Sequence, residues 1–161
     1  MEKSLDLCEG IPVHKQVLIF SDGGSRGNPG PAASAFLILS ENCDLLVRNA
    51  RYLGLRTNNQ AEYEALISAL EAASKIGAKE VICHLDSELV AKQLAGIYTV
   101  KNSELKKLWR KVQEIARSFK KISYINVPRT HLNIQAVDAL VNETLDNVSR
   151  QSLAGKLKHA L

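Results

Sequence analysis

Four acidic side chains occupy positions where a charge is unexpected. Asp22 and Asp86 each end an apolar run with the length of a buried strand, and Glu62 and Asp138 each share a helical face with apolar residues. A charge on an apolar face is costly unless it is paired or binds a metal. Hard divalent ions such as Mg²⁺ prefer oxygen ligands. The four carboxylates therefore predict one shared cation site.

Each carboxylate also has an ordinary explanation. An aspartate that ends a strand is commonly a turn residue or the N-cap of the next helix, and Ser87 opens a helical pattern directly after Asp86. A single glutamate on a helix is usually solvated. The joint occurrence of the four, in the sequence context described below, favours the cation site.

The hydrophobic periodicity and the Gly and Pro breakers predict the element order β-β-β-α-β-α-α-β-α. The predicted strands are residues 17–22, 33–40, 44–53, 80–86 and 121–127. The predicted helices are residues 58–75, 87–95, 103–119 and 134–149. Residues 22–31, rich in Gly and Pro, predict a turn. Consecutive strands favour an antiparallel meander, and strands separated by helices favour parallel crossovers. The pattern therefore predicts an α/β fold with a mixed sheet flanked by helices.

Length and composition are those of an ordinary globular domain, with 161 residues, 45% hydrophobic and 24% charged. We expect a poorly ordered lead-in at residues 1–16, one domain at residues 17–150 and a tail at residues 151–161, which either extends the last helix or hangs loose. No apolar run approaches a membrane span, and the N-terminus lacks the apolar core of a signal peptide. Three cysteines, an odd number without metal-ligand spacing, argue against disulfides. We therefore expect a cytoplasmic protein without a membrane partner.

The positive charge is concentrated in residues 101–121, which hold eight Lys or Arg against two acids, a local charge of +6. Such a stripe suits a phosphate backbone, and the alternative is a solvated helix face. Within helix 103–119 we expect the apolar residues to pack on the sheet. Lys107, Arg110 and Lys111 would then remain free to contact phosphates.

Four segments of the chain resemble type 1 ribonuclease H. They are SDGGSRGNPGP (21–31), TNNQAEYEAL (57–66), LDSELVAKQL (85–94) and VPRTHLNIQAVDALVN (127–142). They follow the family's order and spacing, and the resemblance covers residues 17 to about 148. It implies a ribonuclease H-like fold with a mixed five-stranded sheet, in a short form without a basic protrusion or a separate hybrid-binding domain.

The resemblance also implies an activity, the endonucleolytic hydrolysis of the RNA strand of an RNA–DNA hybrid to give 5′-phosphate and 3′-hydroxyl ends. By match, Asp22, Glu62, Asp86 and Asp138 are catalytic metal-binding carboxylates. They would hold two Mg²⁺ ions, or Mn²⁺ in their place, which activate a water and stabilise the leaving oxygen. We expect a monomer whose partner is the hybrid.

Further residues match the family's substrate contacts. Asn28, Asn58 and Asn59 match residues at the hybrid's minor groove, whose 2′-hydroxyls identify RNA. Thr57 matches a phosphate contact. Gly23, in the glycine-rich segment that allows close backbone approach, and Ser87, next to Asp86, complete the expected contacts. The alternatives are that Asn28 is only a turn residue and Asn58 only a helix cap.

Two basic residues near the last carboxylate compete for one role. His131 matches a mobile histidine thought to assist proton transfer or product release, and is otherwise a surface loop residue. Arg129 is the alternative, because many shorter family members place an arginine there. The segment from Asn133 to Asp138 is one residue longer than the family pattern, which leaves the alignment of Asn133 and His131 open.

Other functions compatible with the same fold remain open. One is a non-catalytic nucleic-acid-binding module, although such a module is expected to have lost at least one of the four acids. Another is a nuclease acting on DNA junctions. A reverse-transcriptase fragment is compatible only if the chain is excised from a longer protein.

Overall fold

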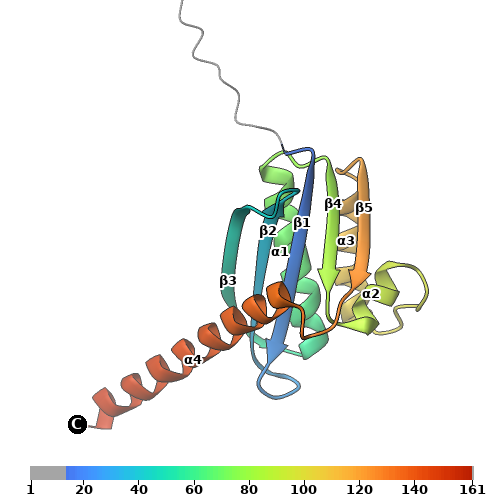
Figure 1. The fold of residues 1–161 in the computed structure, drawn as a ribbon. Helices are drawn as coiled ribbons and strands as arrows, with labels where there is room; N and C mark the ends of the chain where they lie inside the picture. Colours follow the sequence, from blue (N-terminus) through green and yellow to red (C-terminus); the bar gives the residue numbers. More distant parts are fainter. Residues whose placement is uncertain (1–13, 161) are drawn as a thin grey trace, which may run out of the picture.

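In residues 14–160, the part of the chain that the computed structural model describes, helices cover both faces of a mixed five-stranded sheet (Figure 1). The strands are β1 (Gln16–Ser25), β2 (Gly30–Ser40), β3 (Leu45–Arg56), β4 (Glu80–Leu85) and β5 (Lys121–Asn126). The helices are α1 (Asn58–Lys75), α2 (Glu88–Leu94), α3 (Ser103–Ala116) and α4 (Leu132–Ala160). β1, β2 and β3 form an antiparallel meander, β4 pairs in parallel with β1, and β5 pairs in parallel with β4. The sheet order is β3-β2-β1-β4-β5.

Each face of the sheet has its own hydrophobic core. On one face, α1 packs on β1 and β2, and this core includes Ile19, Tyr63 and Leu66. On the other face, α4 crosses the meander and packs Val137 against a core that includes Phe20. The alternation of side chains along β1 sends Ile19 to the first core and Phe20 to the second. β1 is therefore the central strand, which both layers hold in place.

The predicted element order and the mixed sheet are confirmed. α1 has the predicted bounds, because Thr57 forms a capping box with Gln60 and the chain turns at Gly77, which has a positive φ. The turn predicted at residues 22–31 is wrong in its extent. β1 continues pairing with β2 as far as Ser25 opposite Ala32, so only residues 26–29 form the turn.

The last helix extends into the tail, which is one of the two alternatives expected for that segment. α4 continues without a break to Ala160, so residues 151–160 are helical, and its C-terminal end projects beyond the sheet (Figure 1). The predicted domain boundaries stay predictions, and residues 1–13 of the predicted lead-in lie outside the described residues. None of the helices in residues 14–160 combines the length and the apolar character needed to cross a membrane.

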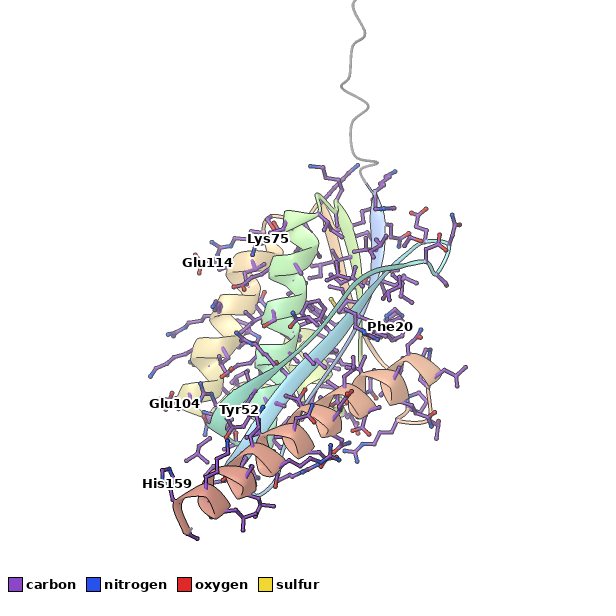
Figure 2. All side chains as sticks on the ribbon, turned by 90° about the vertical axis from the view of Figure 1, so that its left-hand side faces the viewer. Phe20, Tyr52, Lys75, Glu104, Glu114 and His159 are labelled. Carbon is purple, nitrogen blue, oxygen red and sulfur yellow. The ribbon has the colours of Figure 1, made fainter. Side chains whose placement is uncertain are left out.

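α3 packs its apolar face into the core, as predicted. Leu105 and Val112 are buried in the same cluster as Val81 and Cys83 of β4, and α3 also lies against α1. Residues 101–121, however, do not form one surface. Lys120 donates its backbone N–H to the carbonyl of Lys79, which places the end of this segment where β4 begins. Figure 2 shows α3 running from Glu104 at one end of the molecule towards Glu114 near the other.

Candidate active site

Two aspartates lie where the parallel pairing of β1 and β4 stops. The ladder ends at Ser21 opposite Leu85, and the next residue along each strand is Asp22 or Asp86. Asn126 donates its side-chain N–H to the carbonyl of Leu85 at 3.1 Å and so holds the end of β4. In open α/β sheets, ligands bind at the carboxyl ends of the parallel strands. The two aspartates occupy that position.

Glu62 comes from α1, which approaches β1 very closely. A Cβ atom built on Gly23 would lie 2.1 Å from the carbonyl carbon of Ala61, so no other residue type fits there without moving the helix. This contact brings the second turn of α1 against the strand that carries Asp22. Glycine is therefore required at position 23 because the backbone of α1 packs directly against β1 there.

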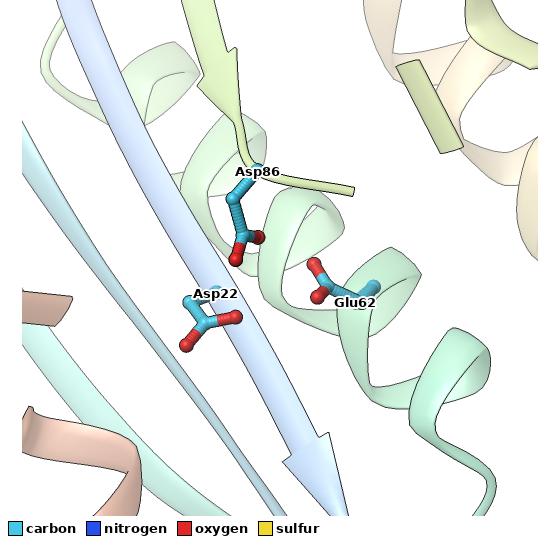
Figure 3. Close-up of side chains that lie close together, drawn as sticks. All are labelled: Asp22, Glu62 and Asp86. Carbon is cyan, nitrogen blue, oxygen red and sulfur yellow. The ribbon is translucent and has the colours of Figure 1, made fainter. Parts of the chain in front are cut away.

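The structure brings Asp22, Glu62 and Asp86 together, with one oxygen of each lying within 4.8 Å of the others (Figure 3). Burial, followed by the charges of Asp86 and Asp138, raises the pKa of Asp22 to about 7. Burial and the charge of Asp22 raise the pKa of Glu62 well above its usual range. Burial also raises the pKa of Asp86, against the opposing effect of Arg129. Without a cation, the cluster thus favours partial protonation.

The three clustered carboxylates line a cleft with a volume of about 240 Å³, and Asp138 and Arg129 line the same cleft. Asp138 is exposed at its rim, and Asn142, one turn later on α4, donates to its carboxylate at 3.3 Å. The Nε of Arg129 lies 3.3 Å from Oδ2 of Asp86, while most of the arginine side chain is exposed. Gln135 also lines the cleft.

The residues present fit a divalent cation. Two of the three clustered carboxylates are almost fully buried, and Oδ1 of Asp86 is a buried oxygen without a hydrogen-bond partner among the described residues. Buried carboxylates this close repel one another unless a cation compensates them. An all-oxygen ligand set matches Mg²⁺ or Mn²⁺ better than it matches softer metals.

The predicted substrate contacts lie beside this cleft. Asn58 lines it, and the backbone N–H of Asn58 donates to Oδ1 of Asn28 at 3.0 Å. The N–H of Ser25 donates to Oδ1 of Asn58 at 3.3 Å. These bonds tie the 26–29 turn to the start of α1 and use the oxygen atoms of both amides. The side-chain NH₂ groups of the two asparagines therefore remain as donors for a ligand.

Two further predicted contacts cap helices, and a third, Asn59, lies in the first turn of α1. Thr57, not Asn58, caps α1, so the helix-cap alternative for Asn58 is wrong. Thr57 and Asn59 line a second hollow with Asn28, of about 280 Å³, which reaches the start of α3. Ser87 caps α2 by accepting from the N–H of Val90 at 3.3 Å. Each of these hydroxyl groups accepts a hydrogen bond and retains its own proton for donation.

His131 is not among the residues that line the carboxylate cleft. Its ring packs against Phe20, with 5.0 Å between centroids, and Phe20 in turn stacks on His84 at 4.3 Å. His84 also contacts the carbonyl of Ile19 through Nδ1 at 3.0 Å, and its burial lowers its pKa. The role of His131 in proton transfer stays a prediction, and Arg129 is the basic residue that the structure places at the carboxylates.

The sequence interpretation missed two residues that support the site. Gln135 precedes Asp138 by three residues, a helical spacing that was available as a signal for a shared face. Asn126 gave no signal, because its bond to the end of β4 joins residues 41 positions apart.

Comparisons with known proteins show the family of the chain. A family model described as reverse transcriptase-like matches residues 20–144. The chain is 39% identical to ribonuclease HI of Halobacterium salinarum over 132 residues, covering 82% of this chain and 65% of that protein. It is 40% identical to the bifunctional protein Rv2228c of Mycobacterium tuberculosis over 140 residues, covering 86% of this chain and 38% of that protein.

Solved structures extend the likeness to three dimensions. The N-terminal RNase H domain of the M. tuberculosis protein superposes with a TM-score of 0.80 at 38% identity, covering 85% of this chain and 98% of that one. LC11-RNase H1, solved in complex with RNA/DNA hybrid, gives a TM-score of 0.76 at 39% identity, covering 82% of this chain and 98% of that one. The chain belongs to the type 1 ribonuclease H family. It spans about 38% of the length of the mycobacterial relatives and about two thirds of the halobacterial one.

Proposed function

We propose that this protein is a metal-dependent endoribonuclease that hydrolyses the RNA strand of RNA–DNA hybrids and leaves 5′-phosphate and 3′-hydroxyl ends. The observation that carries the proposal is the cluster of Asp22, Glu62 and Asp86, whose oxygens lie within 4.8 Å at the carboxyl ends of β1 and β4. Asp138 faces it across the cleft, so all four acids expected of the family are present at one place. A non-catalytic module would not need this costly arrangement.

Asp22, Glu62, Asp86 and Asp138 would hold two Mg²⁺ ions, with Mn²⁺ as a substitute. The bound ions would activate a water molecule and stabilise the leaving oxygen of an in-line displacement. Arg129 is positioned to exchange its contact with Asp86 for a contact with a phosphate oxygen of the substrate. The amide donors of Asn28 and Asn58 are positioned beside the cleft, where they would identify the RNA strand by its 2′-hydroxyls.

We further propose that the protein acts as a monomer in the cytoplasm, without a membrane partner. Cys43 and Cys83 are both unpaired, and the Cys43 thiol is exposed, which suits a reducing compartment.

The test is an end-labelled RNA–DNA hybrid incubated with the protein in Mg²⁺, in Mn²⁺ and in EDTA. We expect cleavage of the RNA strand with either metal, 5′-phosphate on the new ends, and none in EDTA. Duplex DNA, a DNA junction and double-stranded RNA are the matched controls. Cleavage of plain duplex DNA or of a junction as fast as the hybrid would overturn the proposal and favour a junction nuclease.

A further inference from the structure

The end of the sheet opposite the carboxylates gathers positive side chains from three separate parts of the sequence. β1, β4 and β5 begin there side by side, with Gln16, Glu80 and Lys121 in register. Lys79 donates its backbone N–H to the carbonyl of Lys15 at 3.1 Å, and Lys120 donates to the carbonyl of Lys79 at 2.8 Å. Backbone bonds therefore fix these lysines as neighbours.

The charge at this end is strongly unbalanced. We call the group the basic pole, and it consists of Lys15, Lys75, Lys79, Arg117, Lys120 and Lys121. All six are exposed, and none forms an ion pair with another residue of the described range 14–160. Three acids lie near this group on the same elements, namely Glu80, Glu114 and Glu71, and Glu71 pairs with Lys111. The basic pole therefore carries six positive charges against three nearby negative ones among the described residues.

Helix electrostatics account for only part of this group. Lys75 lies in the last turn of α1 and Arg117 caps α3, where cations interact favourably with the helix dipole. Lys15, Lys79 and Lys120 lie in connecting segments, and Lys121 begins a strand, so the dipole does not explain them. Like charges held this close raise the local potential and attract polyanions.

The basic pole is too far from the carboxylates to serve the same stretch of substrate. Asp22 lies six residues along β1 from Gln16, a separation of about 20 Å at the rise of an extended strand. Figure 2 shows Lys75 and Glu114 at one end of the molecule and Glu104 towards the other. A nucleic acid in the cleft would therefore leave this surface free.

We propose that the basic pole is a second nucleic-acid contact, which binds the phosphates of a segment other than the one in the cleft. This choice of ligand rests on the proposed function, since a protein that acts on a polyanionic polymer meets other segments of it at high local concentration. Binding there is independent of base sequence and weakens steeply with salt. It keeps the enzyme on a long substrate between cleavage events, in the manner of a bivalent contact.

The test compares two variants that each lose three positive charges. The pole variant is Lys79→Gln, Lys120→Gln and Lys121→Gln, and the control is Arg150→Gln, Lys156→Gln and Lys158→Gln on the projecting end of α4. Both are made in an Asp86→Asn background, which prevents turnover, and the cleft is first filled with a short unlabelled hybrid. Fluorescence anisotropy then measures the binding of labelled duplex DNA as the second segment.

We expect the parent protein and the control to bind the second duplex with Kd in the range of about 10⁻⁴–10⁻⁶ M at physiological salt. In the pole variant the affinity should fall at least about fivefold, and the salt slope should decrease by about 0.9 for each lost phosphate contact. Replacing the same three lysines by arginine should keep the binding, because the charge is retained. With Asp86 intact, the pole variant should cleave a short hybrid normally and a long hybrid more slowly.

Unchanged duplex binding in the pole variant, or an equal loss in the control, would overturn the proposal. Displacement of the duplex by polyglutamate at equal charge concentration would also overturn it and assign the surface to an acidic protein segment. Slower cleavage of the short hybrid would place the lysines in the substrate groove instead. The binding measurement uses plain DNA and requires no turnover, so its result is independent of hybrid cleavage.

Discussion

Arg129 and Asp86 face each other across the cleft, with the guanidinium Nε 3.3 Å from the carboxylate Oδ2. Arg129 is the only cationic side chain among the described residues that line this cleft, alongside four carboxylates. Its charge lowers the pKa of Asp86 and of Glu62 against the stronger effect of burial. In the absence of metal, Arg129 is therefore the counter-ion of the carboxylate cluster. A divalent cation that binds the cluster competes with Arg129 for the Asp86 carboxylate.

The first prediction follows from that competition. Arg129→Ala should raise the affinity of the protein for Mg²⁺ by about two- to fivefold, the gain expected from removing one exposed competing charge. The same change should slow hybrid cleavage, because a phosphate contact is lost. Isothermal titration calorimetry measures the affinity, and Arg150→Ala on the distant end of α4 is the matched control. A weaker Mg²⁺ affinity in Arg129→Ala would contradict the competition.

The second prediction concerns the carboxylate itself. Asp86→Asn should abolish cleavage and leave the free energy of unfolding in EDTA unchanged or increased, since it removes a like charge from a buried cluster. Denaturant unfolding and the hybrid assay measure the two quantities separately. Turnover at the rate of the unaltered protein would remove Asp86 from the proposed mechanism.

The third prediction is a pH dependence of stability without metal. The pKa of Asp22 is about 7 in the folded protein, against 3.8 as its ordinary value. Between these values the folded state binds more protons than the unfolded state, so stability falls as pH rises from about 4 to 7. Asp22→Asn should therefore melt higher than the unaltered protein at pH 7.5 in EDTA, and the gain should vanish near pH 4.

At pH 7.5 in EDTA, we expect Asp22→Asn to increase the free energy of unfolding by roughly 1–3 kcal/mol. Each added kcal/mol should raise the melting temperature by about 2–4 °C. Excess Mg²⁺ should remove the difference, because the cation compensates the same charges. An equal gain at pH 4 and pH 7.5 would show that the asparagine stabilises the fold for a reason other than charge.

The fourth prediction tests the close contact between Gly23 and the backbone of α1, which positions Glu62 beside Asp22. Gly23→Ala should destabilise the protein by about 3 kcal/mol or more, in the range expected of severe overpacking, because its Cβ meets the backbone of α1. Gly24→Ala is the matched control, since its Cβ would lie 3.5 Å from Cγ1 of Val141, an ordinary contact. Urea unfolding of both variants provides the comparison, and equal stabilities would contradict the close approach.

The fifth prediction concerns the cations on α3. Neutralising Lys107, Arg110 and Lys111 should raise KM with little change in kcat, because contacts to the DNA strand serve the ground state and the transition state alike. Lys107 pairs with Glu104 and Lys111 with Glu71 on the exposed surface, so little stability should be lost. Steady-state kinetics on a short hybrid provides the measurement, and the pole variant is the control of equal charge. An unchanged KM would leave α3 as a solvated surface.

The sequence carried the information for the elements and for the convergence of the acids. Thr57 with Gln60, and Gly77, mark the ends of α1 locally, so its bounds could be predicted. Asp22 and Asp86 converge because parallel strands that start in register also end side by side. Both inferences need only local patterns and the general geometry of parallel strands.

The features that were missed depend on contacts between residues far apart in the chain. The glycines after Asp22 were interpreted as a turn, although pairing with β2 keeps Gly23 and Gly24 extended. The stacking of His131 on Phe20 and the pairing of Arg129 with Asp86 exist only after β5 and α4 have packed. The 101–121 stripe was treated as one surface because sequence proximity does not reveal that its end lies beside Lys79.

β3 is a long strand at the open edge of the sheet, and its composition bears on how the protein behaves at high concentration. An unpaired edge offers backbone donors and acceptors to any other extended chain and is a common starting point for aggregation. Arg48, Arg51 and Arg56 lie along this edge strand, and although Arg51 and Arg56 pair with Glu64, bringing two such edges together would bring an excess of positive charge together. The arginines of β3 thus oppose edge-to-edge assembly, a protection that their replacement by valine would remove.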